Sequence, residues 1–124
     1  MTIPYHEPPE ELSAEAREFH RAIASLVEEL EAVDWYHQRV DVTGDESLKA
    51  ILAHNRDEEI EHAAMTLEWL RRKMPKFDEE LKTYLFTSGA LTELEGDATE
   101  SGGEGAGAPD AGESGGLGIG SLRS

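Results

Sequence analysis

The chain has 124 residues, with 27 acidic against 11 basic side chains, a formal charge of −16 and no cysteine. This balance argues against nucleic-acid binding, which needs a basic surface, and favours the attraction of cations. The absence of cysteine excludes disulfides, thiolate metal sites and cysteine catalysis. No segment reaches the roughly 18 consecutive apolar residues of a membrane span, and the first residues do not resemble a signal peptide. We therefore expect a soluble, cytoplasmic protein.

The first predicted element is a long helix that follows a proline-rich lead-in. Residues 1–12 include three prolines, which resist helix formation, so we expect this segment to be extended. Ser13 is a suitable N-cap for a helix that should end near Arg39. Apolar side chains recur along this helix at steps of three and four, as in an amphipathic helix: Phe19, Ile23, Leu26, Val27, Leu30 and Val33.

A second long helix is predicted after a break at residues 41–46. Either Thr43 or Asp45 caps it, and the sequence does not separate the two. The helix should end at Lys73, because Pro75 cannot continue it. Two long helices joined by a short loop predict an antiparallel hairpin, which leaves an apolar side for another subunit to cover.

The C-terminal part divides into three predicted segments. A short helix should span residues 78–86 and complete a helical hairpin domain at 13–87. The composition then changes, because 11 of the 12 glycines lie from residue 88 onward, together with seven acids. This composition predicts a disordered, flexible linker over 88–116. The chain closes on the short apolar segment 117–124, which has the form of a docking peptide.

Three side chains in the apolar stripes predict a metal site. Glu29 shares a line with Leu26, Val33 and Tyr36 on the first helix, and Glu59 and His62 share a line on the second helix. A carboxylate in a core costs several kcal/mol unless it is paired or binds a metal. The alternative is that these acids form a solvated face or pair with nearby arginines. Their spacing and position in facing stripes favour the metal site.

The predicted ligands form half of a di-iron site. In four-helix di-iron bundles, two helices each supply one Glu and two each supply a Glu-x-x-His pair. This chain supplies one Glu, Glu29, and one such pair, Glu59 and His62. Two copies about a twofold axis would complete a ferritin-like four-helix bundle with four carboxylates and two imidazoles. Carboxylate and imidazole ligands that leave coordination positions open for O₂ suit Fe(II) and its oxidation. A structural zinc site would usually be closed or rich in cysteine.

Further side chains are candidates for supporting roles. Tyr36 lies one turn beyond Val33 and is either a neighbour of the metals or an ordinary interface aromatic. Two sets of residues are either additional cation sites or simple surface charge. The first set is Glu28, Glu31 and Asp34 beside Trp35, and the second is His54, Glu58 and Glu61.

Residues 28–36 (EELEAVDWY) and 51–70 (ILAHNRDEEIEHAAMTLEWL) resemble encapsulated ferritin. The resemblance implies an all-α ferroxidase whose helical hairpins form dimers, with the di-iron site at their interface, and then a ring of dimers. It implies ferroxidase ligands at Glu29, Glu59 and His62, with Tyr36 nearby. It also implies a site where iron enters, at Glu28, Glu31 and Trp35, and a secondary site at His54, Glu58 and Glu61.

The end of the chain is similar to the peptides that load such cargo into encapsulin shells. Leu117, Ile119 and Leu122 would be its apolar anchors. One departure from the family is His37, where we expect an acidic residue. The resemblance thus implies that the protein oxidises iron and passes it on for mineral storage inside an encapsulin nanocompartment. Two alternatives stay open, a di-iron protein that uses peroxide and a non-catalytic helical cargo adaptor.

Overall fold

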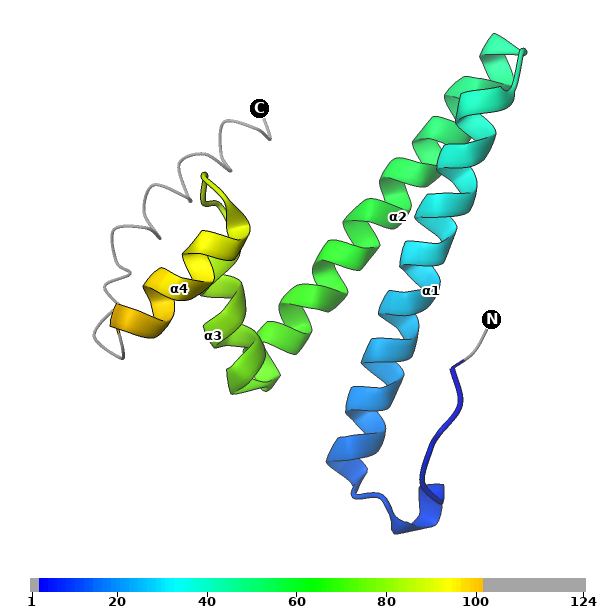
Figure 1. The fold of residues 1–124 in the computed structure, drawn as a ribbon. Coiled ribbons are helices and arrows are strands. Elements are labelled where there is room, and N and C mark those ends of the chain that lie inside the picture. The colour runs from blue at the N-terminus through cyan, green and yellow to red at the C-terminus, as the bar shows by residue number, and fades with distance from the viewer. Residues whose placement is uncertain (1–2, 102–124) are drawn as a thin grey trace. The chain divides into compact units, whose positions relative to one another are not determined.

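A computed structural model describes residues 3–101, with side chains described over 3–96. Every regular element in this part of the chain is helical (Figure 1), and none of these helices is long and apolar enough to cross a membrane. The elements are η1 (Pro9–Glu11), α1 (Ala14–Val42), α2 (Glu46–Lys73), α3 (Pro75–Tyr84) and α4 (Leu91–Ser101). The chain divides after Lys73 into two compact units, one with α1 and α2 and one with α3 and α4. This confirms the all-α class.

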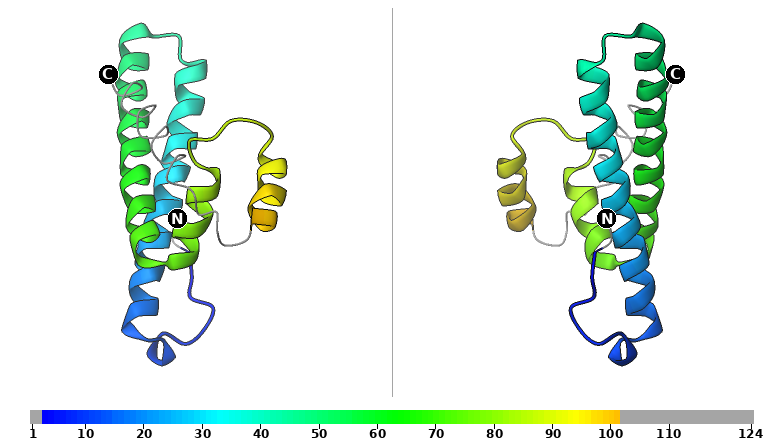
Figure 2. Two further views of the ribbon diagram at one scale, coloured as in Figure 1. Left: turned by 90° about the vertical axis from the view of Figure 1, so that its left-hand side faces the viewer. Right: turned by 90° about the vertical axis from the view of Figure 1, so that its right-hand side faces the viewer.

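The first unit is an antiparallel hairpin in which α1 and α2 lie side by side in all views (Figures 1 and 2). The Ser13 hydroxyl accepts a hydrogen bond from the Ala16 amide at 3.0 Å, which is the N-cap that the sequence predicts. The helix ends at Val42, three residues beyond the predicted end at Arg39. Nothing in the intervening residues breaks a helix, and the chain turns extended only at Thr43, before Gly44.

Asp45 is the residue that caps α2. Its Oδ1 accepts hydrogen bonds from the Leu48 amide at 2.9 Å and from the Ser47 hydroxyl at 2.8 Å. The Leu48 amide, followed by the Ser47 hydroxyl, lowers the pKa of the Asp45 carboxyl below its usual value. Thr43 instead accepts a hydrogen bond from the Asp45 amide at 3.3 Å. The structure thus resolves the choice that the sequence left open.

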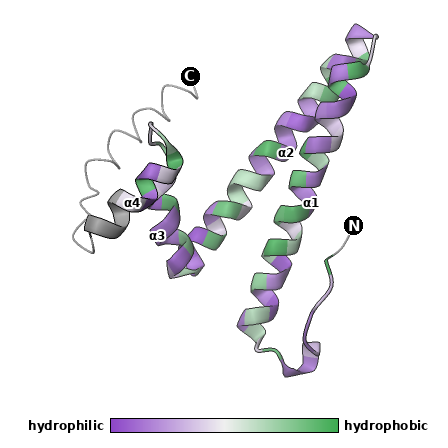
Figure 3. Ribbon diagram, viewed as in Figure 1, coloured by the Kyte–Doolittle hydropathy of each residue, from purple (hydrophilic) through white to green (hydrophobic). Residues whose placement is uncertain are grey.

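The hairpin has a thin core. Among the described residues, only Ala24, Ala63 and Leu70 are buried. Near the open end, the Phe19 and Trp69 rings meet edge to face with centroids 6.0 Å apart. Apolar positions recur along both helices (Figure 3), and several of the large apolar side chains are exposed. A hairpin with this much uncovered apolar surface gains stability from association.

The prolines of the lead-in predicted an extended segment, but the structure differs from this prediction. Pro9 opens the short helix η1, since proline suits the first position of a helical turn. The residues before η1 lie beside α1 (Figure 1), where Tyr5 stacks on His20 with ring centroids 4.1 Å apart. The Arg17 guanidinium donates to the carbonyls of Pro9 and Leu12 at 2.8 and 3.1 Å, which fixes this turn.

The second unit departs from two predicted boundaries. Helix α3 spans Pro75–Tyr84 rather than 78–86, because proline at the first position starts a helix as well as ending the previous one. Helix α4 occupies Leu91–Ser101, inside the segment expected to be a flexible linker. Residues 91–101 contain a single glycine, Gly96, and can form a helix. The prediction missed this helix because it rested on the high glycine content of the tail as a whole. Residues 102–124 lie outside the described part of the chain.

A cluster of charged side chains lies near the C-terminal end of α2, and it predicts that the stability of the fold depends on pH. Arg71, with Arg72, holds the pKa of Glu68 at about 2, well below its ordinary 4.5, through bonds of 2.7 to 2.8 Å. A lowered folded-state pKa stabilises the fold above pH 4.5, and this contribution is lost as the pH falls toward 2. The carboxylate is 41% exposed, so solvent screening keeps the effect modest.

We therefore expect Glu68→Gln to lower the thermal unfolding midpoint by a few degrees at pH 7. The difference from the native chain should shrink as the pH falls from 4.5 toward 2, because the unfolded native chain takes up a proton at Glu68 in this range while the folded chain still holds the carboxylate ionised. Thermal unfolding followed by circular dichroism across this range measures it. A difference between the two chains that stays constant down to pH 2 would contradict the assigned pKa.

Candidate metal centre

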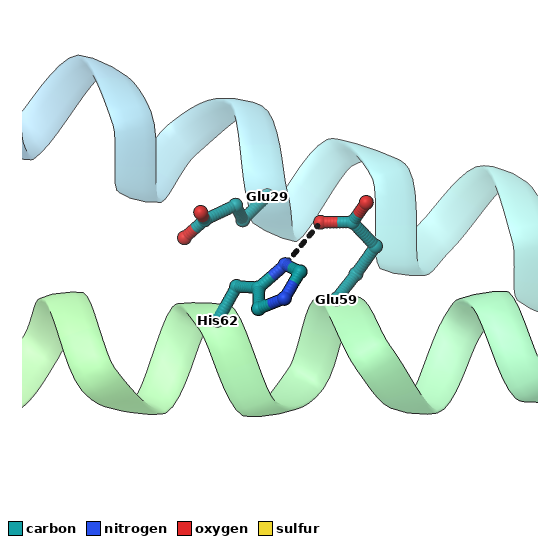
Figure 4. Close-up of side chains that lie close together, drawn as sticks. All are labelled: Glu29, Glu59 and His62. Carbon is teal, nitrogen blue, oxygen red and sulfur yellow. Dashed lines mark ion pairs between the residues drawn. The ribbon is translucent and has the colours of Figure 1, made fainter.

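Three potential metal ligands converge between the two helices of the hairpin. Glu29 comes from α1, and Glu59 and His62 come from successive turns of α2 (Figure 4). Each offers one ligand atom, and these atoms all lie within 4.8 Å of one another. No other group of three or more His, Asp or Glu side chains in the described residues is this compact. The arrangement follows from helix geometry, because residues three apart lie on one face.

The two nitrogens of His62 face different carboxylates. Nδ1 lies 3.6 Å from Oε1 of Glu59, within the group, and Nε2 lies 3.9 Å from Oε1 of Glu58, outside it. Glu59 and His62 are partly accessible in the single chain, with side chains 28% and 42% exposed. An imidazole whose second nitrogen faces a carboxylate is a common arrangement for a metal ligand. Here Nδ1 is the nitrogen that faces the other ligands.

Thr66 contacts this group, although nothing in the sequence analysis assigned it a role. Its hydroxyl lies 3.3 Å from Oε1 of Glu29 and 3.1 Å from the carbonyl oxygen of His62. The available signal was its position one turn beyond His62 in the same row of α2. The hydroxyl thus links the ligand on α1 to the helix that carries the other two.

The structure does not bring the other predicted residues into the ligand group. Tyr36 is half-buried, and the Arg39 guanidinium lies over its ring at 5.4 Å from the centroid. Glu28 and Asp34 are exposed, Glu31 is half-buried, and Trp35 is 48% exposed. The acidic side chains among them form no three-ligand cluster within the described residues, so the predicted entry site stays a prediction.

Of the three residues of the predicted secondary site, the structure brings only two close together. Nε2 of His54 lies 3.8 Å from Oε2 of Glu58, while Glu61 is exposed. Glu58 therefore stands between His54 and His62, with one oxygen toward each imidazole. His54, Glu58 and Glu61 do not form a compact group in the described chain.

His37, the departure from the family pattern, contacts the other helix. The Arg56 guanidinium lies 3.2 Å from its Nδ1. Because a guanidinium is only a donor, Nδ1 of His37 is the acceptor in this contact. His37 thus joins α1 to α2 and does not enter the ligand group.

The chemistry of the group suits a cation. Within the described residues, neither Glu29 nor Glu59 forms an ion pair with lysine or arginine. Two half-buried carboxylates at close range without a counter-ion repel each other, and a metal cation relieves that repulsion. Oxygen and imidazole ligands suit iron and related divalent metals. One chain supplies only three ligands, so the site is open to a second copy.

Comparison with known proteins identifies the family of the chain. The EncFtn-like family matches residues 4–88. An encapsulated ferritin-like protein of Rhodospirillum rubrum is 60% identical over 121 residues, which cover 95% of this chain and 86% of the relative. An encapsulin nanocompartment cargo protein of Myxococcus xanthus is 42% identical over 82 residues, which cover 61% and 63% of the two chains.

A solved structure supports the same assignment. The crystal structure of a protein from Nitrosomonas europaea is 65% identical in sequence and superposes with a TM-score of 0.70. The match covers 72% of this chain and 98% of that protein. The family match spans the hairpin that carries Glu29, Glu59 and His62, and both the sequence and the fold agree with it. The chain therefore belongs to the EncFtn-like family of encapsulated ferritin-like proteins.

Proposed function

We propose that the protein is a ferroxidase that oxidises Fe(II) with O₂ at a di-iron centre formed between two copies of the chain. The observation that carries this proposal is the convergence of Glu29, Glu59 and His62 within 4.8 Å, without a neutralising lysine or arginine. Membership of a ferritin-like family supports iron as the metal. The partial exposure of the ligands supports completion by a second subunit.

The second copy would double the ligand set. Two hairpins about a twofold axis present four carboxylates and two imidazoles, the number that di-iron bundles use. Four carboxylates balance the charge of two Fe²⁺ ions. Leu30 and Ile60, next to Glu29 and Glu59 in the sequence, and Met65, three residues beyond His62, would supply apolar surface for this contact, since they are 54%, 49% and 58% exposed. We propose that these dimers assemble further into a ring.

The residues of the chain have distinct tasks in this centre. Bound iron supplies the redox chemistry, in which each Fe(II) gives one electron to the oxidant and protons from solvent balance the reduced oxygen. Glu29 and Glu59 provide anionic oxygen ligands, and His62 provides the Nδ1 lone pair. Nε2 of His62 lies on the side of Glu58, 3.9 Å from its Oε1, so a neutral imidazole that carries its proton on Nε2 would offer the Nδ1 lone pair to the metal. Tyr36 remains a proposed neighbour of the metals.

Metal titration tests the centre directly. Under anaerobic conditions, Fe²⁺ binding to the native chain should saturate at about one ion per chain, since two chains share two ions. Isothermal titration calorimetry measures the stoichiometry. Zinc should compete, because it generally binds the same ligands more tightly than Fe²⁺. Absence of stoichiometric binding would favour the non-catalytic helical adaptor, whose acids only solvate its surface.

The oxidant is a separate part of the proposal. A ferritin-like di-iron protein that uses peroxide would have the same ligands, so the structure of the centre does not distinguish the two oxidants. Comparing initial rates of Fe(II) oxidation with O₂ and with hydrogen peroxide at equal concentrations decides between them. Faster oxidation by O₂ is the result expected for the ferroxidase.

We further propose that the protein is cargo of a cytoplasmic encapsulin nanocompartment, where the oxidised iron is stored. The names of its relatives from Rhodospirillum rubrum and Myxococcus xanthus support this association. We propose that segment 117–124 docks to the shell, with Leu117, Ile119 and Leu122 as anchors, because it is similar to the peptides that load such cargo. This segment lies outside the residues that the structure describes.

Deleting residues 117–124 should abolish loading into the shell while leaving the metal centre intact. Co-expression with the encapsulin, followed by purification of the shells and quantification of the cargo, measures loading. Replacing Ser121 alone by alanine is a suitable control, since it keeps all three apolar anchors. Cargo that still co-purifies after the deletion would refute the docking assignment.

A further inference from the structure

The Thr66 hydroxyl connects the two halves of the ligand group. It lies 3.3 Å from Oε1 of Glu29 on α1 and 3.1 Å from the carbonyl of His62, one turn earlier on α2. Both contacts are partly buried. Glu59, His62 and Thr66 follow one another at steps of three and four, so they share one face of the helix. Thr66 is thus on the face that meets Glu29.

The hydroxyl has one proton for two acceptors. A threonine within a helix commonly donates to the carbonyl four residues earlier, which here belongs to His62. A carboxylate anion is a stronger acceptor than a neutral carbonyl. The β-branched side chain is also stiff, so it holds the hydroxyl at a fixed position beside Glu29. Thr66 can therefore donate to Glu29 without changing its own rotamer.

A neutral donor suits a metal ligand better than a cation does. Lysine or arginine beside Glu29 would hold the carboxylate but would also neutralise it and compete with the incoming metal. The hydroxyl bonds one carboxylate oxygen and leaves the charge for the metal. Glu29 is the only ligand that α1 contributes, and Thr66 is its hydrogen-bond partner within the described residues.

We propose that Thr66 is a positioning residue, which holds the Glu29 carboxylate in place on the His62 side of the ligand group (Figure 4) before a metal binds. This inference rests on the proposed metal centre. It predicts that loss of the hydroxyl weakens metal binding even when the size and shape of the side chain are kept. Partners of metal ligands typically contribute 10- to 100-fold in affinity.

The test compares Thr66→Val, which is nearly isosteric, with Thr66→Ser, which keeps the hydroxyl. Co²⁺ is titrated into each full-length chain, and its visible absorption reports both affinity and coordination. We expect the valine variant to bind about 10-fold more weakly with an altered spectrum, and the serine variant to bind nearly as the native chain does. Thr83→Val is the matched control, because the Thr83 hydroxyl makes the same contact with a helix carbonyl, that of Glu79, at 3.1 Å in α3.

Two comparisons separate failure of the inference from failure of the centre. If Glu29→Ala weakens Co²⁺ binding and Thr66→Val does not, Thr66 has no positioning role. If Glu29→Ala also binds as the native chain does, the centre itself is wrongly assigned and the inference falls with it. If Thr66→Ser binds Co²⁺ as weakly as Thr66→Val does, the hydroxyl has no positioning role. Should Thr66→Val fail to fold, Thr66→Ala compared with Thr66→Ser decides the question in the same way.

Discussion

Replacing Glu29 by alanine is expected to reduce the initial rate of aerobic Fe(II) oxidation nearly to that of iron in buffer. Glu29 is the only proposed ligand from α1 in the group, and its loss removes one carboxylate from each side of the proposed twofold site. Because partners of metal ligands already contribute 10- to 100-fold, loss of a ligand should cost at least about 10-fold. The growth of ferric absorbance after mixing with Fe²⁺ in air, at equal protein concentration, measures the rate.

Glu59→Ala and His62→Ala should act in the same direction, since each removes another member of the group. Glu15→Ala is the matched control, because Glu15 is an exposed acid in the first turn of the same helix as Glu29. It should oxidise iron at the native rate. Unchanged initial rates in all three ligand variants would disprove the site, whereas loss of activity in the control would indicate a general effect of negative charge.

The convergence of the ligands could be predicted because helix geometry is regular. Glu59 and His62 lie three residues apart in an apolar stripe, and Glu29 lies in the facing stripe, so a hairpin of these helices must bring them near one another. The structure places them within 4.8 Å. Spacing within a long helix is a strong signal because no loop intervenes between the residues concerned.

The contacts that depend on side-chain geometry could not be predicted. Thr66 lies in the predicted stripe, but only the structure shows its hydroxyl between Glu29 and the His62 carbonyl. The choice between Thr43 and Asp45 as the cap of α2 likewise depends on which oxygen reaches the Leu48 amide. Both residue types cap helices well, so sequence preference alone cannot separate them.

Element boundaries were less predictable where composition varies within a segment. Helix α4 was missed because the glycines that follow it dominate the average composition of the tail. The predicted secondary and iron-access sites remain incomplete for a different reason. Their residues form no three-ligand group in the part of the chain that the structure describes, so both sites stay predictions.

Metal binding is expected to drive association of two chains. Bringing four carboxylates together without cations is repulsive, whereas metal ions shared between the chains bind only the assembled state. If each of the two ions is present at 100 times its dissociation constant, linkage stabilises the dimer by about 10⁴-fold in its dissociation constant. Sedimentation velocity across a range of protein concentrations, with and without anaerobic Fe²⁺, measures the change.

The variant His62→Ala separates metal linkage from contact between apolar surfaces. It removes an imidazole but leaves the exposed side chains of Leu30, Ile60 and Met65 in place, so its metal-free association should match that of the native chain. Its response to Fe²⁺ should be greatly reduced. High salt should strengthen metal-free association of both chains, because it screens the repulsion between carboxylates. A native dimer equally stable with and without metal would mean that the ligands do not lie between subunits, and a full metal response in His62→Ala would place the linking ion elsewhere.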